Sequence, residues 1–194
     1  MSIYNKINAG FSLGTGAPIT AGIEDVIYIF NQDDITLTYD TMNPLIVKGL
    51  TAVDTAKVYK FEGTNNSFNT TSKLAKTSVG PRYTEEIDFH VAGFSVGVKT
   101  QLMAMGYGRV CAIVINNYKS SDSAIELCGA VNGLVLTDAE RSAADETVDG
   151  GYKLKLTNPD KLREPYPPRA VSIAPESGSA TYASTLAALE ALTA

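Results

Sequence analysis

The stretch IELCGAVNGLVLTD, residues 125–138, decides how the fold is interpreted. It places Asn132-Gly133 between two alternating apolar runs, which is a strong signal for a β-hairpin. It also places Gly129 inside the first run, where glycine weakens a strand unless the backbone bends there. The pattern therefore leaves two structures open. We favour one strongly curved strand over residues 124–137, with both glycines as bend or bulge points, over a tight hairpin at Asn132.

The preceding apolar run, RVCAIVINN at residues 109–117, is expected to pair with this stretch. A hairpin centred on Lys119 and Ser120 would set Cys111 opposite Cys128, so a cross-strand disulfide is geometrically possible. A chain that folds in the cytosol keeps its thiols reduced, however, and buried cysteine packs as a small apolar side chain. We therefore expect two buried free thiols.

The remainder of the chain is mostly strand-like. In residues 83–92, alternation places Glu86, Asp88 and His90 on one face and the set Glu85, Ile87, Phe89 and Val91 on the other. The polar residues 63–72 are expected to form a long exposed loop. Further alternating or β-branched runs occupy residues 23–30, 35–40, 44–50, 56–63, 73–79 and 152–159.

Helical signals are confined to two segments. The spacing of Val98, Leu102 and Met105 predicts a central helix over about residues 95–105, with Ser95 as its N-cap and Gly106 as its stop. A stripe of apolar residues predicts a C-terminal helix over about residues 180–192. It follows a Pro-rich passage, residues 164–178, that is not expected to join a central strand.

These patterns predict a mainly β fold: a β-sandwich or half-barrel of roughly eight to ten strands with one central and one C-terminal helix. Three regions follow: an extended N-terminal arm at residues 1–22, a β-sandwich or barrel domain at 23–160, and a Pro-rich tether with the C-terminal helix at 161–194. The arm is glycine-spaced and carries one charge, Lys6. We expect it to lie against another surface, such as a neighbouring subunit.

Composition excludes some classes of function. The 194 residues are 44% hydrophobic, enough for a proper core, and the net charge is −5 with a pI near 4.9. An acidic protein is poorly suited to grip nucleic acid through its phosphates. No secretory signal and no apolar run of about 20 residues is present, so we expect synthesis in the cytosol and no membrane partner.

One motif suggests a catalytic serine. GFSVG, residues 93–97, matches the G-x-S-x-G nucleophile elbow, with a strand before it and a helix after it. The only histidine, His90, lies five residues upstream, whereas the hydrolase order places the histidine far downstream. Ser95 is therefore expected to be a helix N-cap.

Other sites are also not supported. His90 shares a strand face with Asp88 and Glu86, but one imidazole and two carboxylates do not make a structural zinc site. The glycines of residues 10–18 lack the phosphate-loop lysine. We expect no catalytic, cofactor-binding or metal-ligating residues, no cofactor and no enzymatic activity.

The order of four segments provides a resemblance: GPRYTEEIDFHVAG at residues 80–93, GRVCAIVINNY at 108–118, the opening stretch, and YKLKLTNP at 152–159. Together they resemble virion structural proteins of tailed bacteriophages, particularly those that infect Bacteroidetes. Within that group the chain is most similar to tail tube proteins. The similarity covers most of residues 23–159.

The resemblance implies a β-sandwich or half-barrel flanked by a helix. Six copies would form a ring whose inner strands join into one β-barrel, and rings would stack into a tube for DNA. Loops and arms would reach adjacent rings, and the lumen would be acidic. Glu86 and Asp88 are candidates for that lumen, with an outward solvated face as the alternative.

The resemblance also implies the partners. These are further copies of the chain, through the arm at residues 1–22 and the loop region at 62–78, other tail proteins, and DNA as a transient, non-specific passenger. Assembly would occur in the bacterial cytoplasm and the protein would reside in the virion tail. Alternatives are a head–tail connector, a tail terminator, a capsid-associated protein, or a stand-alone ligand-binding β-barrel.

Overall fold

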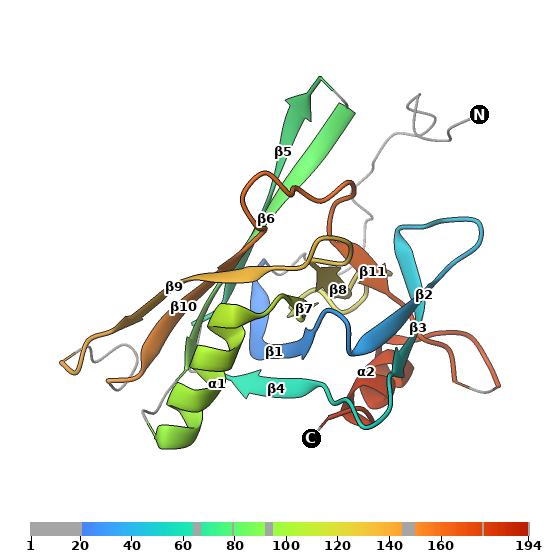
Figure 1. Ribbon diagram of the computed structural model, residues 1–194. Helices are drawn as coiled ribbons and strands as arrows, with labels where there is room; N and C mark the ends of the chain where they lie inside the picture. Colours follow the sequence, from blue (N-terminus) through green and yellow to red (C-terminus); the bar gives the residue numbers. More distant parts are fainter. Residues whose placement is uncertain are drawn as a thin grey trace.

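The computed structural model describes residues 21–63, 67–78, 80–91, 95–144, 150–175 and 177–193. Within them the chain forms eleven strands and two helices (Figure 1). The elements are β1 Ile23–Asn31, β2 Ile35–Tyr39, β3 Ile46–Ala52, β4 Tyr59–Glu62, β5 Asn69–Thr77, β6 Gly80–Val91, α1 Val96–Tyr107, β7 Val110–Asn116, β8 Ile125–Cys128, β9 Val135–Arg141, β10 Tyr152–Thr157, β11 Arg169–Val171 and α2 Tyr182–Glu190.

The strands form two sheets. A seven-stranded sheet has the order β2-β3-β11-β8-β7-β1-β4, and a four-stranded sheet has the order β5-β6-β10-β9. The four-stranded sheet is antiparallel throughout, whereas β11 and β3 pair in parallel. The prediction of a mainly β, sandwich-like fold with two helices is confirmed.

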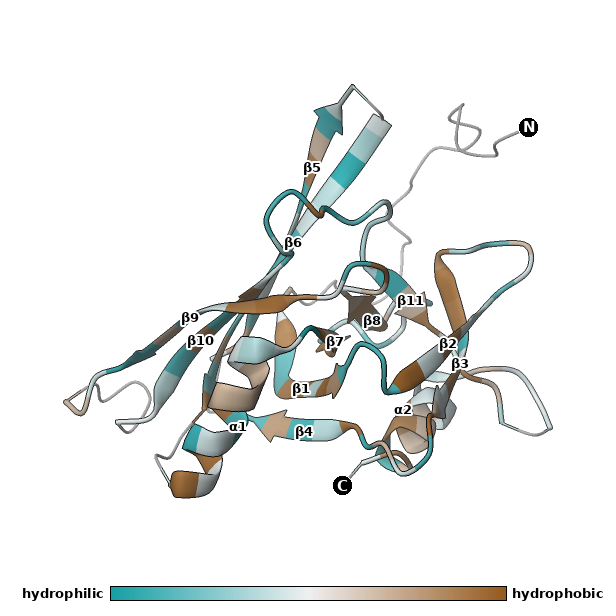
Figure 2. Cartoon of the chain, in the orientation of Figure 1, coloured by the Kyte–Doolittle hydropathy of each residue, from teal (hydrophilic) through white to brown (hydrophobic). Residues whose placement is uncertain are grey.

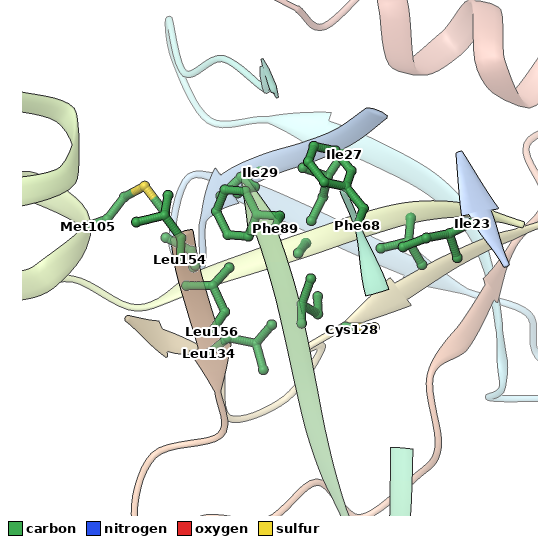
Figure 3. Packing of buried hydrophobic residues seen from close by; sticks show 14 of the residues in the cluster. Ile23, Ile27, Ile29, Phe68, Phe89, Met105, Cys128, Leu134, Leu154 and Leu156 are labelled. Carbon is green, nitrogen blue, oxygen red and sulfur yellow. The ribbon is translucent and has the colours of Figure 1, made fainter. Parts of the chain in front are cut away.

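One apolar core fills the space between the two sheets. Alternation turns Ile87 and Phe89 of β6 inward, into the same core as Ile27 and Ile29 of β1. Figure 3 shows Phe89 with Ile27 and Ile29 in this core. Phe68 packs edge-on against Phe89, with ring centroids 5.9 Å apart. Met105 of α1 contributes to the same core.

A second core lies on the other face of the seven-stranded sheet, beneath α2. Leu189 of α2 packs there against Ile113 and Ile115 of β7. Because both faces of β7 are covered, its first six residues are all buried. Thr181 and Ser184 form a capping box that fixes the start of α2.

The expected curved strand over residues 124–137 is wrong, and so is the alternative hairpin. β8 belongs to the seven-stranded sheet and β9 to the four-stranded sheet, so the two do not pair with each other. Between them the chain crosses from one sheet to the other in a turn that Gly133 closes by donating its N–H to the Gly129 carbonyl. Both glycines have positive φ, which explains why glycine occupies these positions. They form the crossover between the sheets and do not bend a single strand.

The register of β7 and β8 also differs from the expectation by one residue. Cys128 lies opposite Ala112, not Cys111, because the connecting loop is centred on Ser120 rather than between Lys119 and Ser120. A shift of one residue sends the two thiols to opposite faces of the sheet, each into a different core. Both are buried and free, as predicted.

The polar segment at residues 63–72 is not a long exposed loop. Residues 64–66 lie outside the described residues, but Ser67 and Phe68 are buried and β5 begins at Asn69. The loop was predicted because asparagine and threonine, which are common in turns, are frequent in this segment. Tertiary pairing of β5 with β6 overrides that local preference.

Two expectations about helix ends and prolines need correction. α1 continues through Gly106 to Tyr107, because a helix interior tolerates one glycine at a cost of about 1 kcal/mol. The Pro-rich passage does supply an interior strand: β11, between β3 and β8, falls in the proline-free gap after Pro168.

Neither described helix is long and apolar enough to cross a membrane.

Candidate assembly surface

The four-stranded sheet turns one face to its core and presents a second face that is almost wholly polar. The register sets which side chains share this second face. We call it the polar face, and its members are the polar Asn69, Thr71, Lys73, Arg82, Thr84, Glu86, Asp88, His90, Asp138, Glu140, Lys153, Lys155 and Thr157 with the apolar Ala75 and Val135. The predicted alternation in β6 is thus confirmed.

Acids and bases alternate across the polar face. The Lys155 ammonium lies 2.5 Å from a carboxylate oxygen of Glu86 and 3.9 Å from one of Asp88. The hydrogen bond to Glu86 raises the pKa of Lys155. Glu86 and Asp88, the two acids expected at a lumen, therefore lie on a common polar surface but share it with a lysine.

The two edge strands of this sheet carry opposite charge. β5 has Lys73 and Lys76 and no acidic residue. β9 has the acids Asp138 and Glu140 and one base, Arg141, so its net charge is negative, and its last five residues are exposed. Figure 2 shows the corresponding change along β9 from hydrophobic to hydrophilic residues. Unpaired backbone groups along such an edge are a template for another strand.

A buried carboxylate holds the crossover between the sheets. Glu85 is 2% exposed, and its Oε2 accepts a hydrogen bond of 2.6 Å from the Gly129 N–H. Burial raises the pKa of Glu85 from 4.5 to about 8, opposed by that hydrogen bond. The Asn158 side chain in turn accepts from the Glu85 N–H.

A second buried carboxylate holds the same turn from the other side. Glu164 accepts hydrogen bonds from the backbone N–H groups of Val131 and Asn132, and burial raises its pKa. Arg169 stacks on the rings of Tyr39 and Tyr166. Its positive charge offsets part of the rise in the pKa of Glu164, which stays above its ordinary value. Glu85 and Glu164 thus accept hydrogen bonds from three backbone N–H groups of the turn, those of Gly129, Val131 and Asn132.

Sequence reasoning missed this carboxylate pair. The signal for Glu85 was present, because alternation placed it on the core face beside Ile87 and Phe89. No such signal existed for Glu164, which lies in the Pro-rich passage. Backbone pairing between Glu164 and Tyr83 brings it beside β6, across 81 positions of sequence.

The supposed nucleophile elbow is a helix cap. The Ser95 hydroxyl oxygen accepts a hydrogen bond of 3.3 Å from the Val98 N–H, as the N-cap prediction requires. Gly93 and Phe94 of the motif lie outside the described residues. Among the residues that the structure describes, no three His, Cys, Asp or Glu side chains are grouped so that they could hold a metal ion.

A basic hollow lies at one end of the polar face. Its volume is about 620 Å³, and Arg82, Lys161 and Arg163 contribute positive charge to its lining. Lys161 has a φ of 67°, a left-handed conformation that lysine rarely adopts. Positive charge thus gathers at the end of the sheet where β5 and β6 are joined.

Comparison with known proteins gives no match to a family model, to a curated protein or to a solved structure. Function is therefore inferred from the geometry of the described residues and from the resemblance in segment order.

Proposed function

We propose that the chain is a self-assembling structural protein, a tail tube protein of a tailed bacteriophage. Its four-stranded sheets join edge to edge, β5 of one copy with β9 of the next, into a closed ring of about six copies. The observation that carries the proposal is a sheet with one polar face and two edge strands that have no further partner strand among the described residues and carry opposite net charge. In a ring, the polar face lines the lumen.

Strand direction favours this pairing. The four strands alternate in direction, so β5 and β9 run opposite ways. When a second copy is related to the first by rotation about the ring axis, its β5 meets the first copy's β9 in antiparallel orientation. The ladder then continues without a break for any number of copies, and no edge is left exposed.

Charge favours the same pairing. A β5–β9 contact brings Lys73 toward Asp138 and Glu140, which lie on the same face of the sheet, whereas Lys76 lies on the core side. A β5–β5 or β9–β9 contact would instead bring like charges together, which destabilises cross-strand neighbours. Head-to-tail closure is therefore preferred over a two-fold dimer.

The dimensions suit a DNA tube. Six copies of the sheet supply 24 strands. Strands about 4.8 Å apart and tilted by about 40° give such a barrel a backbone radius of about 24 Å. This radius leaves a lumen wider than a DNA duplex once side chains are added. The second sheet and α2 add about 20 Å outside the barrel, for a ring roughly 100 Å wide.

The polar face suits passage rather than binding of DNA. Lys155 is paired with Glu86, so its charge is largely offset. Lys153 lies opposite both His90 and Glu140 in the register. Interleaved acids and bases offer no continuous positive track for phosphates, whose contacts dominate affinity for DNA.

Edge-charge exchange tests the proposal. The variant Lys73→Glu/Lys76→Glu makes both edges acidic, and Asp138→Lys/Glu140→Lys makes both edges basic. We expect neither variant to form rings alone, and an equimolar mixture to form rings in which the two alternate, because each contact is then between opposite charges. Negative-stain images and sedimentation would report the assembly, with melting temperatures as the folding control.

The outcomes separate the competing functions. Rings that stack into tubes support the tail tube. Single rings that never stack would favour a head–tail connector or a tail terminator. A wild-type chain that stays monomeric at every concentration would overturn the proposal and favour a stand-alone β protein.

A further inference from the structure

Helix α1 is apolar on two sides. Leu102 and Met105 are buried in the core between the sheets. Val96, Met103 and Tyr107 are 80%, 64% and 89% exposed. Their spacing of seven and four residues places them on one stripe of the helix, which we call the α1 stripe. Large apolar side chains gathered on one exposed surface indicate an interaction site.

Helix α1 lies beside β9, an edge strand of the four-stranded sheet among the described residues. α1 contacts β9 on the core side of that sheet and closes the open side of the sandwich (Figure 1). On its other flank, a hollow of about 250 Å³ separates α1 from Tyr59 and Phe61 of β4. A strand added to β9 would therefore turn its core-side residues toward α1.

The opposite edge of the same sheet carries an uncovered leucine. Leu74 of β5 is 61% exposed. In the register it lies opposite Tyr83, which shares the core side of β6 with Glu85 and Ile87. The β5–β6 hairpin extends beyond the sandwich, so the molecule's own core does not reach Leu74 (Figure 1).

We propose that Leu74 of one copy packs against the α1 stripe of the next. The inference rests on the proposed β5–β9 pairing, and it identifies an apolar contact that would stabilise this interface. Both surfaces lie on the core side of the sheet, at opposite edges that carry opposite charge. Joining the edges brings the uncovered leucine over the uncovered helix without any change of fold.

This contact supplies apolar binding energy that the charged edge strands do not provide. Exposed ion pairs contribute little and are screened by salt. Specific interfaces depend instead on a few desolvated apolar or aromatic anchors. Among the described residues of β5 and α1, the exposed large apolar side chains are Leu74, Val96, Met103 and Tyr107.

Cross-linking tests the contact directly. The double variant Leu74→Cys/Tyr107→Cys is treated with a short bis-maleimide, while the native Cys111 and Cys128 stay buried. We expect a ladder of linked oligomers that ends at the closed ring. The matched control is Leu74→Cys/Met42→Cys, since Met42 is 85% exposed but lies in the β2–β3 connection, and it should give no ladder.

Substitution tests the energy of the contact. Leu74→Glu and Tyr107→Glu should each raise the concentration needed for assembly by about tenfold or more, and the loss should persist in high salt. Met42→Glu should leave the concentration needed for assembly unchanged. All three positions are exposed, so folding should survive, and melting temperatures would verify this.

The results distinguish this inference from the proposed function. Rings that form normally in Leu74→Glu and Tyr107→Glu, without Leu74–Tyr107 cross-links in the cysteine variant, would overturn the inference and leave the tube intact. Specific cross-links that never close into rings would support the contact and reject the ring. A monomer without cross-links would reject both.

Discussion

Gly129 and Gly133 have φ values of 72° and 71°, a region that residues with a Cβ rarely occupy. A Cβ on Gly129 would lie 2.8 Å from Cγ of Leu134 and 3.1 Å from the Gly133 carbonyl carbon. Neither neighbour can withdraw, because Leu134 is fully buried and Gly133 is part of the same turn. The crossover between the sheets therefore requires glycine.

Gly129→Ala should lower the free energy of unfolding by about 2–4 kcal/mol, through left-handed strain and the clash with Leu134. Urea titration would measure the loss. The matched control is Gly106→Ala, where a Cβ meets nothing within 4 Å and the backbone is helical. That variant should be neutral or up to about 1 kcal/mol more stable. Equal effects at both positions would contradict this account of the crossover.

Glu85 should make stability depend on pH. Burial raises its pKa to about 8 in the folded protein, against 4.5 in the unfolded chain. The folded state therefore binds the proton more tightly, and the stabilisation is complete below pH 4.5 and is lost as the pH rises toward 8. Glu164 shifts in the same direction and adds to the trend.

Glu85→Gln should flatten this dependence, because the amide oxygen still accepts from Gly129 but does not titrate. We expect the free energy of unfolding of the wild type to fall, relative to the variant, by about 1 kcal/mol for each pH unit between 5 and 8. Urea titrations at several pH values would measure it. Parallel pH profiles for the two proteins would show that Glu85 has no raised pKa.

At the scale of elements, α1 shows how a local signal can suggest two functions. The same Ser95 that fits a nucleophile elbow also fits an N-cap, and its hydroxyl accepts the Val98 N–H. Ser95→Ala should cost about 1 kcal/mol of stability. It should leave any background hydrolysis of a chromogenic ester unchanged. Ester hydrolysis that disappears in Ser95→Ala would restore the enzyme hypothesis.

The β7–β8 pair shows how much one residue of register decides. The two thiols were expected to face each other, but the shift places Cys111 against the α2 core and Cys128 in the core between the sheets. Burial raises the pKa of Cys111 to about 12, so the thiol stays protonated. Loop geometry, which local sequence does not specify, sets the register.

For the whole molecule, residues 1–20 of the predicted arm lie outside the described residues, and the described fold begins at Ala21. Within the described residues the last part of the arm is held by Asn117, whose backbone N–H and side chain donate to the carbonyls of Gly22 and Ala21. Deleting residues 1–20 should therefore preserve the fold and the melting temperature. We expect tube growth, followed by electron microscopy, to be lost. An unfolded deletion variant would instead make the arm part of the core.

Sequence alone determined the features that depend on neighbouring residues. Alternation separated the core side of β6 from its polar side, and Ser95 marked the start of α1, because strand pleat and helix caps are set within a few residues. The mainly β class and the two helices followed from the same short-range periods.

Only the tertiary structure decided which strands share a sheet. β8 and β9 are adjacent in sequence yet lie in different sheets, and β11 enters the seven-stranded sheet from a Pro-rich passage. Backbone hydrogen bonds are equally available to any strand, so the choice depends on packing between distant segments. The Glu164 carboxylate that holds the turn at Val131 is one such contact, and it could not be derived from either segment alone.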